Sequence, residues 1–283
     1  MSNDVNLVRD IKYNRYLYKI HTDTKSLSGL KKTGYILGHV FKAAAGHGLL
    51  LNDYKKKISE DGYIYHMPEN EGVGGVTVYV PYCEHDCIQM TIIRDQTYFD
   101  VTALKQLKEK YLRPGMRIAD IGTNIGNHSL FFAHECQASH LWQFEPQKDI
   151  FRILQKNMEL NHLSGICESY NVGLGAKDGN AAISAYNKDN TGGTSIRMDE
   201  DGGIEVRCLD EYKLTDVDFL KIDVEGFEYN VLLGAERTLQ QNHPTLYIEI
   251  WQKNFDKVNT LLGKYGYHQA ERMGDADYIY QKV

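Results

Sequence analysis

The sequence predicts an α/β protein with a mostly parallel sheet, helices on both faces of that sheet, and a mixed segment of helices and a β-hairpin in front of it. From Met116 onward, short β-branched or apolar runs alternate with stretches of helical periodicity, which is the pattern of βαβ units. A glycine-rich turn follows the first of these strands and opens the first helix. Ligands of such sheets bind beyond the carboxyl ends of the strands, so we expect the functional site there.

Composition limits the class of protein. The 283 residues suit one large domain, or a medium domain with an added segment. The formal net charge is −6, whereas nucleic-acid-binding proteins usually carry a basic excess, so the charge argues against that class. The N-terminus lacks the apolar run of a signal peptide, and no stretch has the length of a transmembrane helix. The five cysteines are an odd number, as expected for free thiols, and we therefore expect a cytoplasmic protein.

Residues 1–111 are expected to form an accessory segment in front of a main domain over residues 112–283. The elements that periodicity predicts in the accessory segment are a helix over residues 5–20, a helix over residues 27–51, a strand at Val76–Val80, its hairpin partner at Met90–Ile93, and a helix at Val101–Leu112. Pro114 and Gly115 end the last of these helices.

The main domain is predicted to alternate strands and helices. Its predicted strands are Arg117–Ile121, His140–Phe144, Ile166–Val172, Phe219–Val224, Thr245–Ile250 and Tyr278–Lys282, and its predicted helices are Asn127–Cys136, Asp149–Leu160, Tyr229–Leu239 and Phe255–Tyr265. Between the third and fourth strands, Ala181–Tyr186 and Ile204–Cys208 are predicted to form an inserted hairpin around a glycine-rich tip.

The run Asp120–His128 is the predicted cofactor turn. Gly122 permits a tight turn, and Gly126 permits close packing of the following helix against the strand. Asn124 stands where a dinucleotide fingerprint has its second glycine, which lets the backbone approach a pyrophosphate. A side chain at this position argues against NAD, but it does not obstruct S-adenosylmethionine, which has no phosphate.

The surrounding residues have the spacing that S-adenosylmethionine requires. The exposed amides of the turn and of the helix start, up to Asn127, are expected to meet the methionine carboxylate, and Asp120 its ammonium group, directly or through water. Glu145, followed by Pro146, ends the next strand about 20 residues later, where an acidic residue accepts hydrogen bonds from both ribose hydroxyls. Asn171 and Val172, at the end of the third strand, are expected to contact the adenine.

Five motifs together resemble the FkbM family of methyltransferases. They are Asp120-Ile-Gly-Thr-Asn-Ile-Gly126, Phe144-Glu-Pro146, Asn171-Val-Gly-Leu-Gly175, Leu209-Asp210 and Lys221-Ile-Asp-Val-Glu-Gly-Phe-Glu228. The resemblance covers roughly Tyr111 to Trp251. It implies a Rossmann-like class I methyltransferase sheet, with S-adenosylmethionine as cofactor and a hydroxyl of a sugar, glycan or polyketide-like molecule as methyl acceptor. Thr123 stands where the family usually has Ala.

The run from Lys221 to Gly226 is the predicted catalytic strand end. Because side chains alternate along a strand, Lys221, Asp223 and Glu225 are expected to share a face. Two mechanisms fit. Either Asp223 or Glu225 is a general base while Lys221 stabilises the alkoxide, or Asp223 and Glu225, with Glu249, hold Mg²⁺ or another divalent metal that binds the acceptor hydroxyl. A Lys–Asp ion pair that only seats the strand is the structural alternative.

Weaker signals leave alternatives open. His128 is either a base beside the cofactor or a helix-start histidine satisfied by local hydrogen bonds. The polar insert Asn190–Ser195 either closes over the acceptor or is a bare hairpin tip. Cys83-Glu-His85-Asp-Cys87 is half of a zinc motif without a second pair, which favours a polar hairpin loop. Three tyrosines of the first helix either pack on the main domain, stack on sugar rings or form a homodimer interface: Tyr13, Tyr16 and Tyr18.

O-methylation of a sugar or glycan hydroxyl is therefore the leading functional hypothesis. Methylation of a non-sugar hydroxyl or of a nitrogen is the second. The third is a catalytically silent cofactor-binding partner subunit, which the intact Lys221, Asp223 and Glu225 disfavour. We expect no nucleic-acid partner and no membrane span.

Overall fold

The computed structural model describes residues 58–70, 72–185 and 189–282. The two helices predicted over residues 5–51, with Tyr13, Tyr16 and Tyr18, lie outside the described residues. Within the described part of the chain, no helix is long and apolar enough to cross a membrane.

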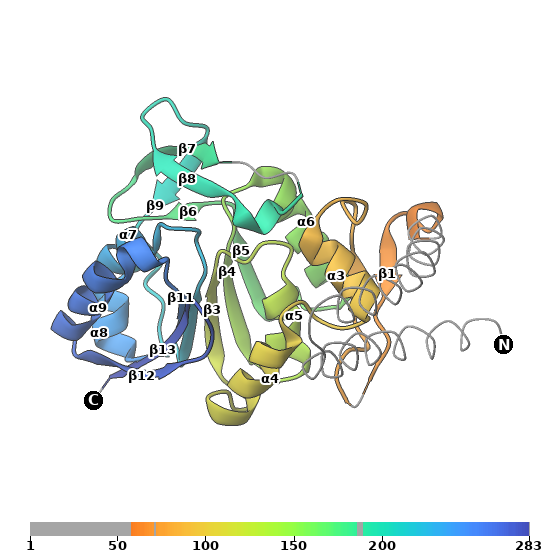
Figure 1. The fold of residues 1–283 in the computed structure, drawn as a ribbon, viewed down its shortest axis with the longest axis horizontal. Helices are drawn as coiled ribbons and strands as arrows, with labels where there is room; N and C mark the ends of the chain where they lie inside the picture. The colour runs from red at the N-terminus through yellow and green to blue at the C-terminus, as the bar shows by residue number, and fades with distance from the viewer. Residues whose placement is uncertain (1–57, 71, 186–188, 283) are drawn as a thin grey trace, which may run out of the picture.

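A seven-stranded mixed sheet forms the centre of the molecule (Figure 1). Its strands, in spatial order, are β12 (Tyr267–Arg272), β13 (Asp277–Lys282), β11 (Thr245–Glu249), β10 (Phe219–Ile222), β3 (Arg117–Ile121), β4 (His140–Phe144) and β5 (Cys167–Tyr170). The last five of these run parallel, whereas β13 is antiparallel to both of its neighbours. The predicted α/β architecture is thus confirmed, and the sheet positions the ends of its parallel strands along one edge.

Helices cover both faces of the sheet (Figure 1). One face carries α4 (Val101–Lys110), α5 (Asn127–His134) and α6 (Lys148–Leu160), and the other carries α7 (Glu228–Leu233), α8 (Glu236–Asn242) and α9 (Phe255–Lys264). Strand alternation divides the core accordingly, because Ile118 packs toward the α5 face while Ala119 and Ile121 pack toward the α9 face. Asp120 therefore points to the α5 face.

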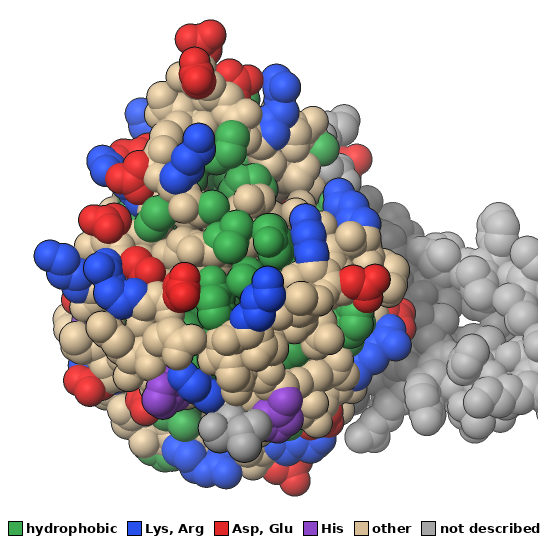
Figure 2. Space-filling view, turned by 90° about the vertical axis from the view of Figure 1, so that its left-hand side faces the viewer, with side chains coloured by type: hydrophobic (Ala, Val, Ile, Leu, Met, Phe, Trp, Pro, Cys, Tyr) green, Lys and Arg blue, Asp and Glu red, His purple; other side chains and the backbone are tan. Residues whose placement is uncertain are grey.

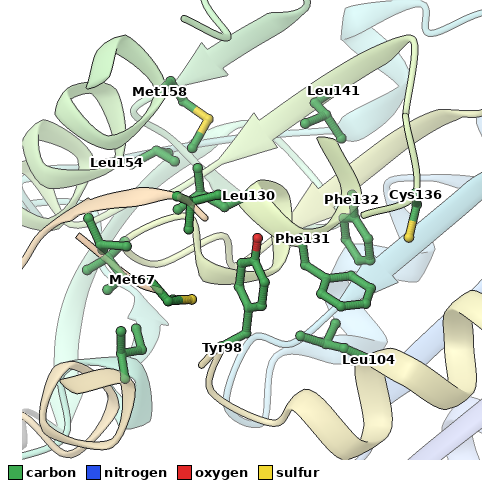
Figure 3. Packing of buried hydrophobic residues seen from close by; sticks show 14 of the residues in the cluster. Met67, Tyr98, Leu104, Leu130, Phe131, Phe132, Cys136, Leu141, Leu154 and Met158 are labelled. Carbon is green, nitrogen blue, oxygen red and sulfur yellow. The ribbon is translucent and has the colours of Figure 1, made fainter. Parts of the chain in front are cut away.

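The described residues before residue 112, 58–70 and 72–111, are docked on α5 and α6. Figure 3 shows Tyr98 among the buried side chains of α4, α5 and α6, and its ring meets that of Phe131 edge to face at a centroid distance of 5.2 Å. Asn157 of α6 accepts a hydrogen bond from the Tyr79 amide at 2.6 Å, and Asn161 pairs with both backbone groups of Thr77. Residues on both sides of the predicted boundary at residue 111 thus share one hydrophobic core, and the division into domains stays a prediction.

The predicted N-terminal hairpin exists, but its partner strand was predicted wrongly. β2 (Thr77–Tyr79) pairs with β1 (Ile64–His66). The predicted partner Met90–Ile93 instead lies in helix α3 (Cys87–Asp95). Asp86 caps this helix by accepting a hydrogen bond from the Gln89 amide, and the buried residues Gln89, Ile92 and Ile93 have helical spacing. The Cys83–Cys87 run is therefore a turn that leads into a helix, rather than a hairpin loop.

The insert between β5 and β10 is larger than the predicted hairpin. β7 (Gly179–Ala185) does pair with β9 (Ile204–Arg207), but β6 (Gly173–Leu174) and β8 (Ser195–Met198) complete a four-stranded sheet. The prediction of one helix over Tyr229–Leu239 was also wrong, since α7 ends at Leu233. Gly234 follows it, and a Cβ there would overlap the carbonyl oxygen of Gly175. β12 was not predicted.

The face that carries α7 to α9 and the inserted sheet has a mixed surface (Figure 2). Basic and acidic side chains of the described residues are interspersed on it, rather than gathered in a basic stripe of the kind that binds nucleic acid.

Candidate active site

A cavity of about 370 Å³ opens at the carboxyl edge of the sheet. Four groups of residues line it: the turn after β3, the ends of β4, β10 and β11, the start of β13, and segments from the N-terminal part and the insert. Six residues of the predicted cofactor set line it: Gly122, Asn124, Asn127, Glu145, Pro146 and Val172. The predicted catalytic and metal-binding residues also line it: His128, Lys221, Asp223, Glu225 and Glu249. The structure thus brings most of the predicted site residues to one place.

The turn after β3 depends on left-handed backbone conformations. Gly122, Asn124 and Gly126 have φ angles of 74°, 53° and 88°. A Cβ on Gly122 would overlap the carbonyl oxygen of Asp223, so this glycine lets the cofactor turn touch the end of β10. A Cβ on Gly126 would come within 2.8 Å of Leu154 in α6, so Gly126 permits close packing of α5 against a helix, not against the strand as predicted.

Glu145 is the buried carboxylate of the turn. Its side chain accepts hydrogen bonds from the Asn124 amide at 2.9 Å and from the Gln147 amide at 2.8 Å, and only 3% of the residue is exposed. Burial raises the pKa of Glu145 to about 7, against the opposing effect of these two amides. Glu145 lines the cavity, and each of its carboxylate oxygens has a further lone pair that can accept a hydrogen bond from a ligand.

Three residues of the predicted cofactor set do not line the cavity. Asp120 is fully buried behind it and accepts a hydrogen bond from Ser129 at 2.7 Å. The Asn171 amide donates to the carbonyl oxygens of Glu145 and Pro146 at 2.9 and 3.1 Å, and so holds the strand end that carries Glu145. Gly126 serves helix packing. In this structure, Asp120 and Asn171 act on the site through their neighbours.

Asn127 has a second function besides lining the cavity. Its side-chain oxygen accepts from the Phe99 amide at 2.9 Å, and its side-chain nitrogen donates to the Phe99 carbonyl oxygen at 3.0 Å. This two-point clamp places Phe99 and Asp100 in the cavity wall.

Lys221 is buried at the centre of the site, with 2% of its side chain exposed. Its ammonium group donates to the Gly122 carbonyl oxygen at 2.8 Å and lies 3.2 Å from Asp120 and 3.6 Å from Asp223. Although burial alone would lower it, the two carboxylates raise the pKa of Lys221 above its usual value. These contacts are those of an ion pair that seats the strand, the structural alternative for Lys221.

Lys221, Asp223 and Glu225 share the cavity, although not by strand alternation as predicted. β10 ends at Ile222, and Glu225 lies in a turn with a φ angle of 50°. The turn brings the carboxylate back to the cavity, where burial and Asp223 raise the pKa of Glu225 to about 7.

Glu249 and Asp223 are hydrogen-bonded neighbours in the cavity. Burial, followed by the charge of Asp223 and this hydrogen bond, raises the pKa of Glu249 well above its usual value. Among the described residues, no three His, Cys, Asp or Glu side chains are grouped as ligands of one metal ion. The metal site that the sequence suggested at Asp223, Glu225 and Glu249 therefore stays a prediction.

His128 is a candidate base whose Nε2 atom is buried and makes no hydrogen bond within the described residues. The alternative of a histidine satisfied at that atom by local hydrogen bonds is thus not what the structure shows. Burial, followed by the positive charge of Lys221, lowers the pKa of His128 to about 4, so the imidazole is neutral at neutral pH.

Sequence reasoning missed two carboxylates of the cavity, Asp100 and Asp277. Burial and the charge of Asp277 raise the pKa of Asp100 to about 6. Asp100 precedes α4 but makes no side-chain capping bond, so its carboxylate is left to face the cavity. An N-cap aspartate is an ordinary helix signal, and only the fold shows that this one has another role.

Comparison with known proteins identifies the family. The model of the methyltransferase FkbM domain matches residues 120–268, more than half of the chain. Methyltransferase 1 of Beauveria bassiana is 27% identical over 188 residues, covering 56% of this chain and 74% of that protein. Among solved structures, methyltransferase FkbM of Methylobacillus flagellatus is 17% identical, with a TM-score of 0.43. The match covers 71% of this chain but only 56% of that protein's length. Precorrin-6y C5,15-methyltransferase of Geobacter metallireducens is 11% identical, with a TM-score of 0.41 over 65% of this chain and 86% of the other. This chain belongs to the FkbM family of S-adenosylmethionine-dependent methyltransferases.

Proposed function

We propose that this protein transfers the methyl group of S-adenosylmethionine to a hydroxyl of a sugar or glycan. One observation carries the proposal: a single cavity joins the turn that suits this cofactor, with Glu145 at its edge, to a group of carboxyl side chains around Asp223. Proton acceptors beside a methyl donor are what O-methylation of an alcohol needs, because an alcohol must lose its proton as it attacks.

The residues of the cavity wall fit the cofactor. Glu145 would accept hydrogen bonds from the ribose hydroxyls. The amides of Gly122 to Gly126 already donate within the protein, so the amides at the start of α5, from Asn127, would meet the methionine carboxylate. Pro146 and Val172 offer apolar contacts for the adenine, while Asn171 supports them from outside. S-adenosylmethionine, when bound, supplies an electrophilic methyl group on a positively charged sulfur.

Glu225 is the proposed general base. A pKa near 7 matches the requirement that a base be ionised at neutral pH and still hold a proton well. The acceptor oxygen forms a bond to the methyl carbon as the carbon–sulfur bond breaks, and the hydroxyl proton passes to Glu225. Asp223 orients the hydroxyl, and Lys221 positions Asp223. His128, neutral and with a free Nε2, is the second candidate for the base.

The charge of the cavity bears on the acceptor. Besides Glu145, five carboxyl groups line it, with Lys221 as the compensating cation: Asp100, Asp223, Glu225, Glu249 and Asp277. Carboxylates accept hydrogen bonds from neutral hydroxyls but repel phosphate and carboxylate groups. A neutral sugar fits this wall. An amine also fits, and this observation supports nitrogen methylation as the second candidate function.

Calorimetric titration with S-adenosylhomocysteine tests the cofactor site. Wild type is expected to bind with micromolar affinity, and Glu145→Ala to bind at least about tenfold more weakly, because the ribose loses charge-assisted hydrogen bonds. Transfer of labelled methyl groups to neutral glycans, amino sugars and sugar phosphates, each with and without a chelator, then tests the acceptor and the metal. A folded wild type that binds no S-adenosylhomocysteine would refute the proposal and favour a silent partner subunit.

A further inference from the structure

The loop over residues 189–194, here called the roof loop, covers the cofactor turn. Asn190, Gly192 and Thr194 line the cavity, whereas Thr191 points away from it and is 1% exposed. A Cβ on Gly192 would lie 2.9 Å from the Asn124 side-chain nitrogen and 2.8 Å from Ile88, so the roof loop rests directly on the cofactor turn and on α3. The position of this loop therefore sets the shape of the cofactor end of the cavity.

A buried carboxylate from the N-terminal segment holds the roof loop. One oxygen of Asp86 accepts hydrogen bonds from the Thr191 amide and the Thr191 hydroxyl, both at 2.8 Å. The other oxygen accepts from the Gln89 amide at 2.9 Å, at the start of α3. Asp86 is fully buried, and the Cys87 amide adds a bond to the Asp189 carbonyl oxygen at 2.9 Å. Hydrogen bonds that a carboxylate accepts from backbone amides are among the strong ones in proteins.

The roof loop is also fixed on the side of Glu145. The Gln147 side-chain nitrogen donates to the Thr191 carbonyl oxygen at 3.1 Å. The amide of the same residue donates to Glu145, the proposed ribose ligand. Thr191 thus joins Asp86, which lies outside the region matched by the family model, to the strand end that carries Glu145.

We propose that Asp86 is a positioning residue for the cofactor: through Thr191 it holds the roof loop over the turn, so that the N-terminal segment is part of the cofactor site. The proposal rests on the proposed function, since it assumes that the cavity takes S-adenosylmethionine. Neither Asp86 nor Thr191 lines the cavity, so a loss of affinity on changing Thr191 cannot come from a lost direct contact.

The chain offers a matched control for the test. Thr238 is 3% exposed, and both its amide and its hydroxyl donate to one oxygen of Asp210, at 2.8 and 2.7 Å. This is the same arrangement as that of Thr191 on Asp86, but neither residue lines the cavity or touches the roof loop. Thr191→Val and Thr238→Val therefore remove equivalent hydrogen bonds, and only the first acts on the roof loop.

The experiment measures binding and dissociation of S-adenosylhomocysteine for wild type, Thr191→Val, Thr191→Ser and Thr238→Val, with thermal unfolding of each. We expect Thr191→Val to bind about tenfold more weakly through a faster dissociation rate. Thr191→Ser, which keeps the hydroxyl, should restore wild-type affinity. Thr238→Val should lower the unfolding temperature to a similar extent while leaving the affinity unchanged.

Wild-type affinity in a folded Thr191→Val would overturn the proposal, as would an equal loss in Thr238→Val. If Thr191→Val does not fold, Asp86→Asn takes its place, because Asn keeps the volume and an oxygen for the Gln89 amide. Absence of binding to wild type would instead count against the proposed function itself, so the two failures are distinguishable.

Discussion

Gly122→Ala is the substitution that most directly tests whether the cofactor turn and the end of β10 depend on each other. A Cβ at this position would overlap the carbonyl oxygen of Asp223, so the backbone of one of them must move by about 1 Å, a displacement that disturbs a preorganised site. In addition, the left-handed φ angle of 74° costs an alanine about 1–2 kcal/mol.

Gly115→Ala separates these two effects. Gly115 has a φ angle of 85°, and an added Cβ there meets no atom within 4 Å. It should therefore lose only the conformational term of about 1–2 kcal/mol in the free energy of unfolding. Gly122→Ala should lose about 1–3 kcal/mol more from overpacking. It should also bind S-adenosylhomocysteine at least about tenfold more weakly, because the shifted wall loses hydrogen bonds to the ligand.

Urea unfolding and calorimetry on the two variants give the answer. Equal losses of stability in Gly122→Ala and Gly115→Ala, together with unchanged affinity in both, would refute the claimed contact between the turn and Asp223.

Three further predictions concern the charged groups of the site. Because burial raises the pKa of Glu225 to about 7, wild-type turnover should rise with pH through about 7 and then level off. In a pH–rate profile, Glu225→Gln should lose about 100-fold in rate and should also lose this pH dependence. The raised pKa of Glu145 means that its ionised form is lost below about pH 7, so the affinity for S-adenosylhomocysteine should fall by up to about tenfold per pH unit below that pH. Calorimetry that finds no such fall in wild type, or the same fall in Glu145→Gln, would contradict this. Lys221→Met leaves the buried Asp120 without its cation and should lower the free energy of unfolding by about 3–5 kcal/mol, and a loss below about 1 kcal/mol in urea unfolding would show that the ion pair is not structural.

Local patterns were sufficient to predict the strands that carry the cofactor turn. β3 and β4 begin and end at the predicted residues, because each is a short apolar run bounded by clear turn signals. Helix α4 was predicted to within its last turn. The run Met90–Ile93 was predicted as the hairpin partner of the preceding strand, although the spacing of Gln89, Ile92 and Ile93 and the cap at Asp86 favour a helix.

Contacts between distant segments could not be predicted in this way. Asp277 enters the cavity only because β13 inserts antiparallel beside β11, and Asp100 only because Asn127 clamps its neighbour Phe99. The assignment of Asp120 to the cofactor ammonium followed from its place in the motif, whereas the fold gives its carboxylate to Lys221 and Ser129. A motif defines which residues are near the ligand, but not which of them is already engaged.

The clamp between Asn127 and Phe99 also bears on the order of folding. It joins positions 28 residues apart, and the chain between them includes α4 and the first strand of the central sheet. Closing such a loop has an entropic cost that must be met before the clamp forms. Phe99 and Asp100 reach the cavity wall only when this loop has closed, so a partly folded chain that has formed its sheet but not docked α4 has an incomplete pocket. Tight capture of the cofactor is thereby reserved for the fully folded chain, which the cofactor then stabilises by mass action.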